Sequence, residues 1–140
     1  MIIGFTGTQN GMTDPQKKQV EKSLRLMYSY GSIFIHGDCI GADAEAHEIA
    51  LRLGYRVWIY PGNIGAKRAY CKGAELIVHP QNPLERNRAI AHMCDKLIAT
   101  PSTKTEIVRS GTWATVRYAR KEHKPRVIID PLGDTVYEMD

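Results

Sequence analysis

The sequence has few of the residues on which several classes of protein depend. Of its 140 residues only three are cysteines, two are tryptophans and two are phenylalanines, and aromatic residues make up 8%. The cysteines are odd in number and form no CxxC pair, which indicates neither a disulfide framework nor a zinc site. The histidines form no HExxH motif, so we expect neither a metal nor a cofactor. No hydrophobic run approaches the roughly 18 residues of a membrane span, so no membrane partner is expected.

Charge of neither sign dominates the sequence. Lys and Arg number 19 against 15 Asp and Glu, and the net charge of +4 is by itself too small to indicate nucleic-acid binding. Residues 100–126 are locally basic, which fits either a solvated helix face or a site for an anionic ligand. The first residues lack the basic and apolar regions of a signal peptide, so we expect a cytoplasmic location.

The chain length and the order of its segments predict one α/β domain over residues 1–140. At roughly 100–200 residues per domain the length suits a single core. Short apolar runs predict strands at 2–5, 32–36, 56–60, 75–79, 96–99 and 126–129, and amphipathic segments predict helices over about 14–30, 42–53, 84–94 and 112–121. Alternation of this kind predicts a mainly parallel sheet of about six strands with helices on both faces.

Four loops at predicted strand ends carry residues suited to an anion. Ligands of open α/β sheets bind outside the carboxyl ends of the strands, where residues 4–11, 36–43, 84–88 and 100–112 lie. Glycine-rich loops and helix N-termini present backbone N–H groups to a phosphate, and an arginine can donate to it twice. The convergence of four such loops on one crevice predicts a phosphate or nucleotide site.

Each of these signals also has a structural interpretation. Asp43 either caps the following helix or accepts hydrogen bonds from sugar hydroxyls, and His36 is either structural or a general acid or base. Ser110 is either a helix N-cap or a phosphate contact. Arg86 and Arg88 are two residues apart on a helix, so one is expected to face the crevice and the other solvent or a carboxylate.

The residues of these loops resemble a known superfamily. The pattern His-Gly-x-x-x-Gly-Ala-Asp at 36–43 continues with Ala46-His47, Ala50, Gly54, Tyr60-Pro61, Arg86-Asn87-Arg88 and Ser110-Gly111-Thr112. Over about residues 1–130 the chain is similar to the Rossmann-like SLOG superfamily, which includes YspA-like proteins, DNA-processing protein A and the Lonely Guy enzymes. The resemblance implies a Rossmann-like sheet whose loops bind a nucleotide or a nucleotide-derived ligand. It also implies self-association, because SLOG relatives often form dimers or larger assemblies.

The loops and the resemblance together define a set of candidate ligand-binding residues. They are Gly7, Thr8, His36, Gly37, Gly41, Ala42, Asp43, Pro61, Arg86, Asn87, Arg88, Ser110, Gly111 and Thr112. The Lonely Guy enzymes have a motif PGGxGTxxE whose Glu acts on the N-glycosidic bond of a nucleoside monophosphate. Here Thr115 stands at the Glu position, and a threonine cannot replace a carboxylate in that chemistry. The catalytic residues therefore stay unassigned, although Asp43, Glu45 or Glu106 could supply a carboxylate.

Three functions from different classes follow. The first is a module that binds a phosphorylated nucleoside or an NAD- or ADP-ribose-type ligand. The second is an N-glycosidase of the phosphoribohydrolase type with a rearranged carboxylate. The third is a single-stranded DNA-binding protein related to DNA processing, although the modest charge and few aromatic residues make nucleic acid the less expected partner.

Overall fold

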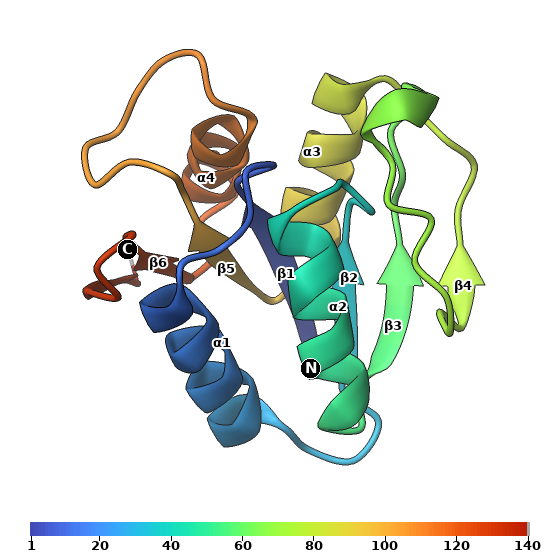
Figure 1. The fold of residues 1–140 in the computed structure, drawn as a ribbon, viewed down its shortest axis with the longest axis horizontal. Helices are drawn as coiled ribbons and strands as arrows, with labels where there is room; N and C mark the ends of the chain where they lie inside the picture. Colours follow the sequence, from blue (N-terminus) through green and yellow to red (C-terminus); the bar gives the residue numbers. More distant parts are fainter. Residues whose placement is uncertain (140) are drawn as a thin grey trace.

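The computed structural model describes residues 1–139, which form an α/β sandwich around one sheet (Figure 1). The strands of this sheet are β1 (Ile2–Gly7), β2 (Ile33–His36), β3 (Arg56–Ile59), β4 (Leu76–Ile77), β5 (Lys96–Thr100), β6 (Arg126–Ile129) and β7 (Thr135–Glu138). The α-helices are α1 (Asp14–Met27), α2 (Ala42–Arg52), α3 (Pro83–Met93) and α4 (Gly111–Lys121), and a short 3-10 helix, η1, covers Gly65–Lys67.

The order of the strands is that of a doubly wound sheet. It runs β4-β3-β2-β1-β5-β6-β7, and every pair except β6–β7 is parallel. The chain winds outward from β1 through β2 and β3 to β4, then returns through α3 to place β5 on the other side of β1. The winding direction therefore reverses between β1 and β5, and open α/β sheets bind their ligands at such a switch point.

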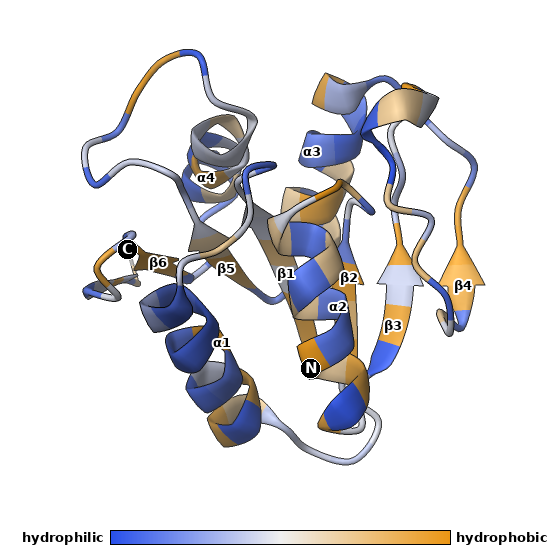
Figure 2. Cartoon of the chain, viewed as in Figure 1, coloured by the Kyte–Doolittle hydropathy of each residue, from blue (hydrophilic) through white to orange (hydrophobic). Residues whose placement is uncertain are grey.

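Helices cover both faces of the sheet, as predicted. On one face α1 and α2 pack their apolar side chains, including Val20 and Leu24, against Phe5 and Phe34 of the central strands. On the other face α3 and α4 contribute a second core that includes Ile90 and Trp113. Figure 2 shows the apolar residues gathered in the strands, while α1 is mostly hydrophilic on its exposed side. No helix among residues 1–139 is long and apolar enough to cross a membrane.

Local capping signals set the helix starts. Thr13 caps α1 and forms a reciprocal capping box with Gln16. Asn82 caps α3 through a hydrogen bond from the Glu85 N–H, and Ser110 caps α4 through one from the Trp113 N–H. These side chains satisfy backbone donors that have no partner inside the helix.

The sheet has seven strands, in agreement with the mainly parallel sheet of about six that the sequence predicted. The seventh, β7, pairs antiparallel with β6 at the edge of the sheet, with Val127 opposite Tyr137. Its residues Val136 and Tyr137 are exposed, so the segment lacks the continuous apolar run that marks the buried parallel strands. Although β7 pairs with the strand directly before it in the chain, an edge strand of this kind is hard to recognise from its own residues.

Candidate functional site

A cavity of about 390 Å³ opens at the carboxyl ends of the central strands, where the winding direction reverses. Its walls come from the end of β1, the loop between β2 and α2, the first turns of α3, and the segment from Ser102 to the start of α4. These segments lie far apart in the sequence. They meet here because parallel strands place all their carboxyl ends at one edge of the sheet.

Nine of the predicted ligand-binding residues line this cavity. They are Gly7, Thr8, Gly37, Asp43, Arg86, Asn87, Ser110, Gly111 and Thr112. Each of the four loops that the sequence singled out contributes at least one of them. The structure thus brings the four loops to a common site.

The other five predicted residues do not line the cavity. His36 is fully buried beneath it, and Pro61 is buried beyond the end of β3. Gly41 and Ala42 begin α2, but the Ala42 N–H donates to the carbonyl of Thr8 and is not available to a ligand. Arg88 lies on the other side of α3, where its guanidinium covers the ring of Tyr118 at 5.1 Å.

Arg86 is the arginine that faces the cavity. Its side chain is buried, with Nη1 donating to the carbonyl of Gly37 at 2.7 Å and Nε donating to Oδ1 of Asn87 at 2.8 Å. Among the described residues no carboxylate lies within ion-pair distance of its guanidinium, whereas Arg88 pairs with Glu85 at 3.7 Å. The expectation that the two arginines point apart is confirmed, and only the folded chain shows which of them is directed at the crevice.

The glycine loop after β2 is organised around a carboxylate of the protein itself. Oδ2 of Asp43 accepts hydrogen bonds from the N–H groups of Gly37 and Cys39, both at 3.1 Å. The sequence pattern predicted that the amides of this loop would bind a phosphate. In the structure the carboxylate of Asp43 accepts their hydrogen bonds instead. Burial raises the pKa of Asp43 to about 6, although Arg86 and the two amides act in the opposite direction.

The start of α4 offers the backbone donors that the β2–α2 loop does not. Ser110 caps the helix by accepting from the Trp113 N–H, while the N–H groups of Gly111 and Thr112 donate to no described residue. Both residues line the cavity. Because a helix N-terminus carries partial positive charge, these two amides and Arg86 form an anion-attracting wall.

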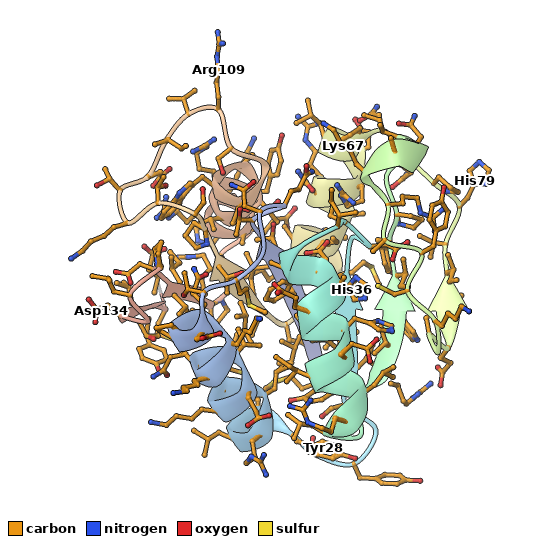
Figure 3. All side chains as sticks on the ribbon, in the orientation of Figure 1. Tyr28, His36, Lys67, His79, Arg109 and Asp134 are labelled. Atoms are coloured by element: carbon orange, nitrogen blue, oxygen red, sulfur yellow. The ribbon has the colours of Figure 1, made fainter. Side chains whose placement is uncertain are left out.

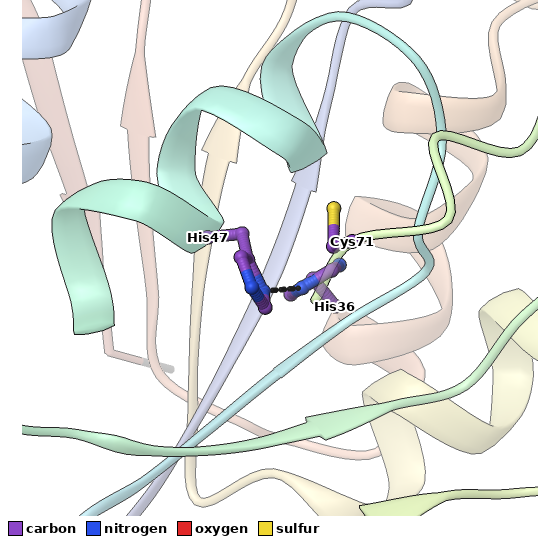
Figure 4. A group of neighbouring side chains, drawn as sticks. All are labelled: His36, His47 and Cys71. Atoms are coloured by element: carbon purple, nitrogen blue, oxygen red, sulfur yellow. Dashed lines mark hydrogen bonds between the residues drawn. The ribbon is translucent and has the colours of Figure 1, made fainter. Parts of the chain in front are cut away.

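His36 belongs to a buried hydrogen-bond chain beneath the cavity (Figure 4). The Asp38 N–H donates to Nδ1 of His36, so the proton of this ring must be on Nε2, which lies 2.8 Å from Nδ1 of His47. His47 then donates from Nε2 to the carbonyl of Lys72 at 2.6 Å. Burial, reinforced by His47, lowers the pKa of His36 to about 3, so this ring is neutral.

The same histidines and Cys71 have ligand atoms within 4.8 Å of one another, close enough for a metal ion. A metal on Nε2 of His36 would move the ring proton to Nδ1, where it would oppose the Asp38 N–H. Burial raises the pKa of the Cys71 thiol to about 12, so this side chain is a protonated thiol in the metal-free protein. The hydrogen bonds therefore assign the two histidines a structural role, namely holding the start of the β2–α2 loop.

Of the three carboxylates that could replace the missing catalytic Glu, only Asp43 lines the cavity. Glu45 accepts from the Met12 N–H and pairs with Lys17, and Glu106 pairs with two arginines of α4. Thr115 itself is buried, and its hydroxyl donates to the carbonyl of Gly111.

The cavity also contains residues that sequence reasoning did not select. Lys67 of η1 and Arg109 of the β5–α4 loop add positive charge to its edges, and both are exposed. Figure 3 shows Arg109 extending from the tip of its loop and Lys67 at the upper end of the molecule near α3. Cys39 also lines the cavity, but burial and then Asp43 raise the pKa of its thiol to about 11. Lys67 follows an irregular segment without a recognisable motif, so no local signal pointed to it.

The fold and the cavity define a Rossmann-like α/β protein with an anion-attracting crevice at the switch point of its sheet. Comparison of the sequence with family models and with curated proteins finds no match. Solved structures, in contrast, share the fold.

The molybdenum cofactor carrier protein of Chlamydomonas reinhardtii is 22% identical, with a TM-score of 0.67 over 94% of this chain and 75% of that one. The molybdenum cofactor binding protein of Rippkaea orientalis is 20% identical, with a TM-score of 0.67 over 92% and 76%. DNA processing protein A of Helicobacter pylori, whose structure concerns single-stranded DNA binding, is 20% identical, with a TM-score of 0.63 over 91% and 64%.

These similarities confirm the Rossmann-like fold that the sequence resemblance implied, and DNA processing protein A, one of the proteins that it named, is among the structures that share it. At identities of 20–22% they show the fold and not the ligand. The presence of a DNA-binding protein among them weakens the expectation that nucleic acid is not a partner.

Proposed function

We propose that this protein binds a phosphorylated nucleoside or an NAD- or ADP-ribose-type ligand in the cavity at the switch point. The observation that carries the proposal is the guanidinium of Arg86. It is buried, it lines the cavity, and no described carboxylate forms an ion pair with it. A buried charge without a paired counter-ion is costly, and a bound anion would remove that cost.

The other donors of the cavity support the same ligand. The N–H groups of Gly111 and Thr112 have no described partner, and Lys67 and Arg109 add charge at the edges. Three cationic side chains thus line the cavity against one carboxylate, that of Asp43. In this proposal the phosphate lies between Arg86 and the start of α4.

The size and the apolar part of the cavity suit the rest of a nucleotide. About 390 Å³ lies within the range of roughly 300–1,000 Å³ that is usual for small-molecule sites. Phe5, Pro83, Ile90 and Ile107 contribute apolar surface for a base or sugar. Proteins with this fold are described as binding the molybdenum cofactor or single-stranded DNA, so the fold accepts ligands of different kinds.

Isothermal titration calorimetry with AMP, ADP, NAD and ADP-ribose tests the proposal. We expect at least one of them to bind, and Arg86→Lys to weaken its binding about tenfold or more, because lysine keeps the charge but loses the planar fork. Arg88→Lys is the matched control, since it makes the same change on the same helix but outside the cavity. The absence of heat with every nucleotide, or equal losses in the two variants, would reject the proposal.

An N-glycosidase is the second candidate, and the placement of Asp43 favours it. This carboxylate is the only one of the three substitutes for the missing Glu that lines the cavity. Incubation with nucleoside monophosphates followed by chromatography would reveal released base. If the chain is an enzyme of this type, Asp43→Asn should abolish release while nucleotide binding persists.

Single-stranded DNA binding and self-association stay predictions from the resemblance. Gel shifts with single strands at two salt concentrations test the first, because phosphate-backbone contacts give a strong salt dependence. Sedimentation of the purified protein tests the second. Binding of DNA that Arg86→Lys leaves unchanged would place the DNA contact outside the cavity.

A further inference from the structure

Asp43 and Arg86 both bond to the backbone of one residue of the cavity wall, Gly37. The N–H of Gly37 donates to Oδ2 of Asp43 at 3.1 Å, and the carbonyl of the same glycine accepts from Nη1 of Arg86 at 2.7 Å. An anion bound by this guanidinium therefore shares the cavity with the Asp43 carboxyl group, which also lines it. The two negative charges would repel each other in a largely buried site, where such repulsion is poorly screened.

The hydrogen bonds decide which oxygen of Asp43 can carry a proton. Oδ2 already accepts from two amides, those of Gly37 and Cys39, whereas no backbone amide of the described residues donates to Oδ1. A proton on Asp43 must therefore be on Oδ1. Because the side chain lines the cavity, this oxygen is the one left to meet a ligand.

Among the described residues that line the cavity, Asp43 is the one whose charge is expected to change near neutral pH. It faces Arg86 from α3 and the thiols of Cys39 and Cys71 from the neighbouring loops. Burial raises the pKa of both thiols, to about 11 for Cys39 and about 12 for Cys71, and His36 behind the loop is neutral. No histidine is among the described residues that line the cavity, and its other charged side chains are the cations Lys67 and Arg109.

We propose that Asp43 is a specificity-determining residue that binds the anionic group of the ligand as a neutral carboxylic acid, donating a hydrogen bond from Oδ1. The inference rests on the proposed function, since it requires an anion at Arg86. In this arrangement each anion that binds brings one proton from solvent to Asp43. The neutral acid then favours a ligand with an acceptor oxygen at this position. An ionised carboxylate would instead favour a ligand hydroxyl there.

The test needs ligands that exchange no proton themselves, because phosphate monoesters titrate near pH 6. ADP-ribose and inorganic sulfate fulfil this condition, since the phosphates of the first are diesters and the second is fully ionised above pH 5. Calorimetry at about pH 5 and about pH 7.5, in buffers that differ in ionisation enthalpy, measures both the affinity and the number of protons taken up.

With the pKa of Asp43 at about 6, affinity should rise about thirtyfold from pH 7.5 to pH 5, with about one proton taken up per ligand at the higher pH. Asp43→Asn imitates the neutral acid, because its amide oxygen can accept the two N–H bonds while its NH₂ group donates. We therefore expect this variant to bind at pH 7.5 as tightly as the native chain does at pH 5, with neither proton uptake nor pH dependence.

Glu45→Gln is the matched control for net charge. It lies on the same helix and removes the same charge, but its carboxylate contacts Met12 and Lys17 outside the cavity. Equal gains in the two variants would overturn the proposal, as would a loss of affinity in Asp43→Asn or binding of ADP-ribose without proton uptake. In those cases the proposed function would stand, whereas failure of sulfate and of all four nucleotides (AMP, ADP, NAD and ADP-ribose) to bind at either pH would overturn both.

Discussion

Replacement of Gly41 by alanine should destabilise the protein more than replacement of any glycine in an open turn. Gly41 precedes α2 with φ 87° and ψ −126°, a conformation that side chains rarely adopt. A methyl group there would overlap the carbonyl of Gln9 and lie 2.8 Å from that of Thr8. Both are backbone atoms, so a simple side-chain rotation cannot relieve the contact.

The expected magnitude has two parts. Holding alanine in a sparsely populated backbone conformation costs about 1–3 kcal/mol, and overpacking adds about 1–3 kcal/mol. We therefore expect Gly41→Ala to lower the free energy of unfolding by about 2–6 kcal/mol. At about 3 °C per kcal/mol for a domain of this size, the midpoint of thermal unfolding should fall by about 6–18 °C.

Gly31→Ala separates the cost of the backbone conformation from the cost of overpacking. Gly31 also has a positive φ, 81°, but no atom would lie within 4 Å of an added methyl group. Its cost should be about 1 kcal/mol, because only the backbone conformation is penalised. Urea unfolding followed by circular dichroism measures both variants, and an equal loss of stability would refute the role assigned to the contact with Gln9.

Three further predictions concern the polar groups beneath and within the cavity. The folded state raises the pKa of Asp43 to about 6, so lowering the pH from about 8 to 5 should add about 1.4 kcal/mol of stability at this residue. His36, with its pKa lowered to about 3, acts in the opposite direction, because the unfolded chain takes up a proton there below about pH 6.5. Urea midpoints of Asp43→Asn should therefore fall more steeply than those of the native chain as the pH drops, and parallel curves would contradict the raised pKa of Asp43. His47→Leu leaves Nε2 of His36 and the carbonyl of Lys72 without partners. It should lower the free energy of unfolding, measured with urea, by about 2–4 kcal/mol. An unchanged free energy of unfolding would contradict the hydrogen-bond chain. Zinc added to chelator-treated protein should not raise the midpoint of thermal unfolding, because the Asp38 N–H disfavours a metal ion on His36. A rise in this midpoint that Cys71→Ala abolishes would contradict the assignment of the His36 proton to Nε2.

Most of the fold was predictable because its signals are local. The buried parallel strands are short apolar runs, and the helices begin at capping residues such as Thr13 and Ser110. Both kinds of signal depend on residues close together in the sequence, and they set the order of elements that defines a doubly wound sheet. The edge strand β7 escaped prediction because Val136 and Tyr137 are exposed, so its residues do not form the apolar run that marks a buried strand.

The amino-acid sequence by itself determined that four polar loops would meet at the carboxyl edge of a parallel sheet, because the alternation of strands and helices dictates where those loops lie. Only the tertiary structure decided how their polar groups divide between ligand and protein. It turned Arg86 toward the cavity and Arg88 away, and it placed Asp43 on the amides that were expected to hold a phosphate. The reason is that a hydrogen bond or a buried charge depends on distances between segments that only folding brings together.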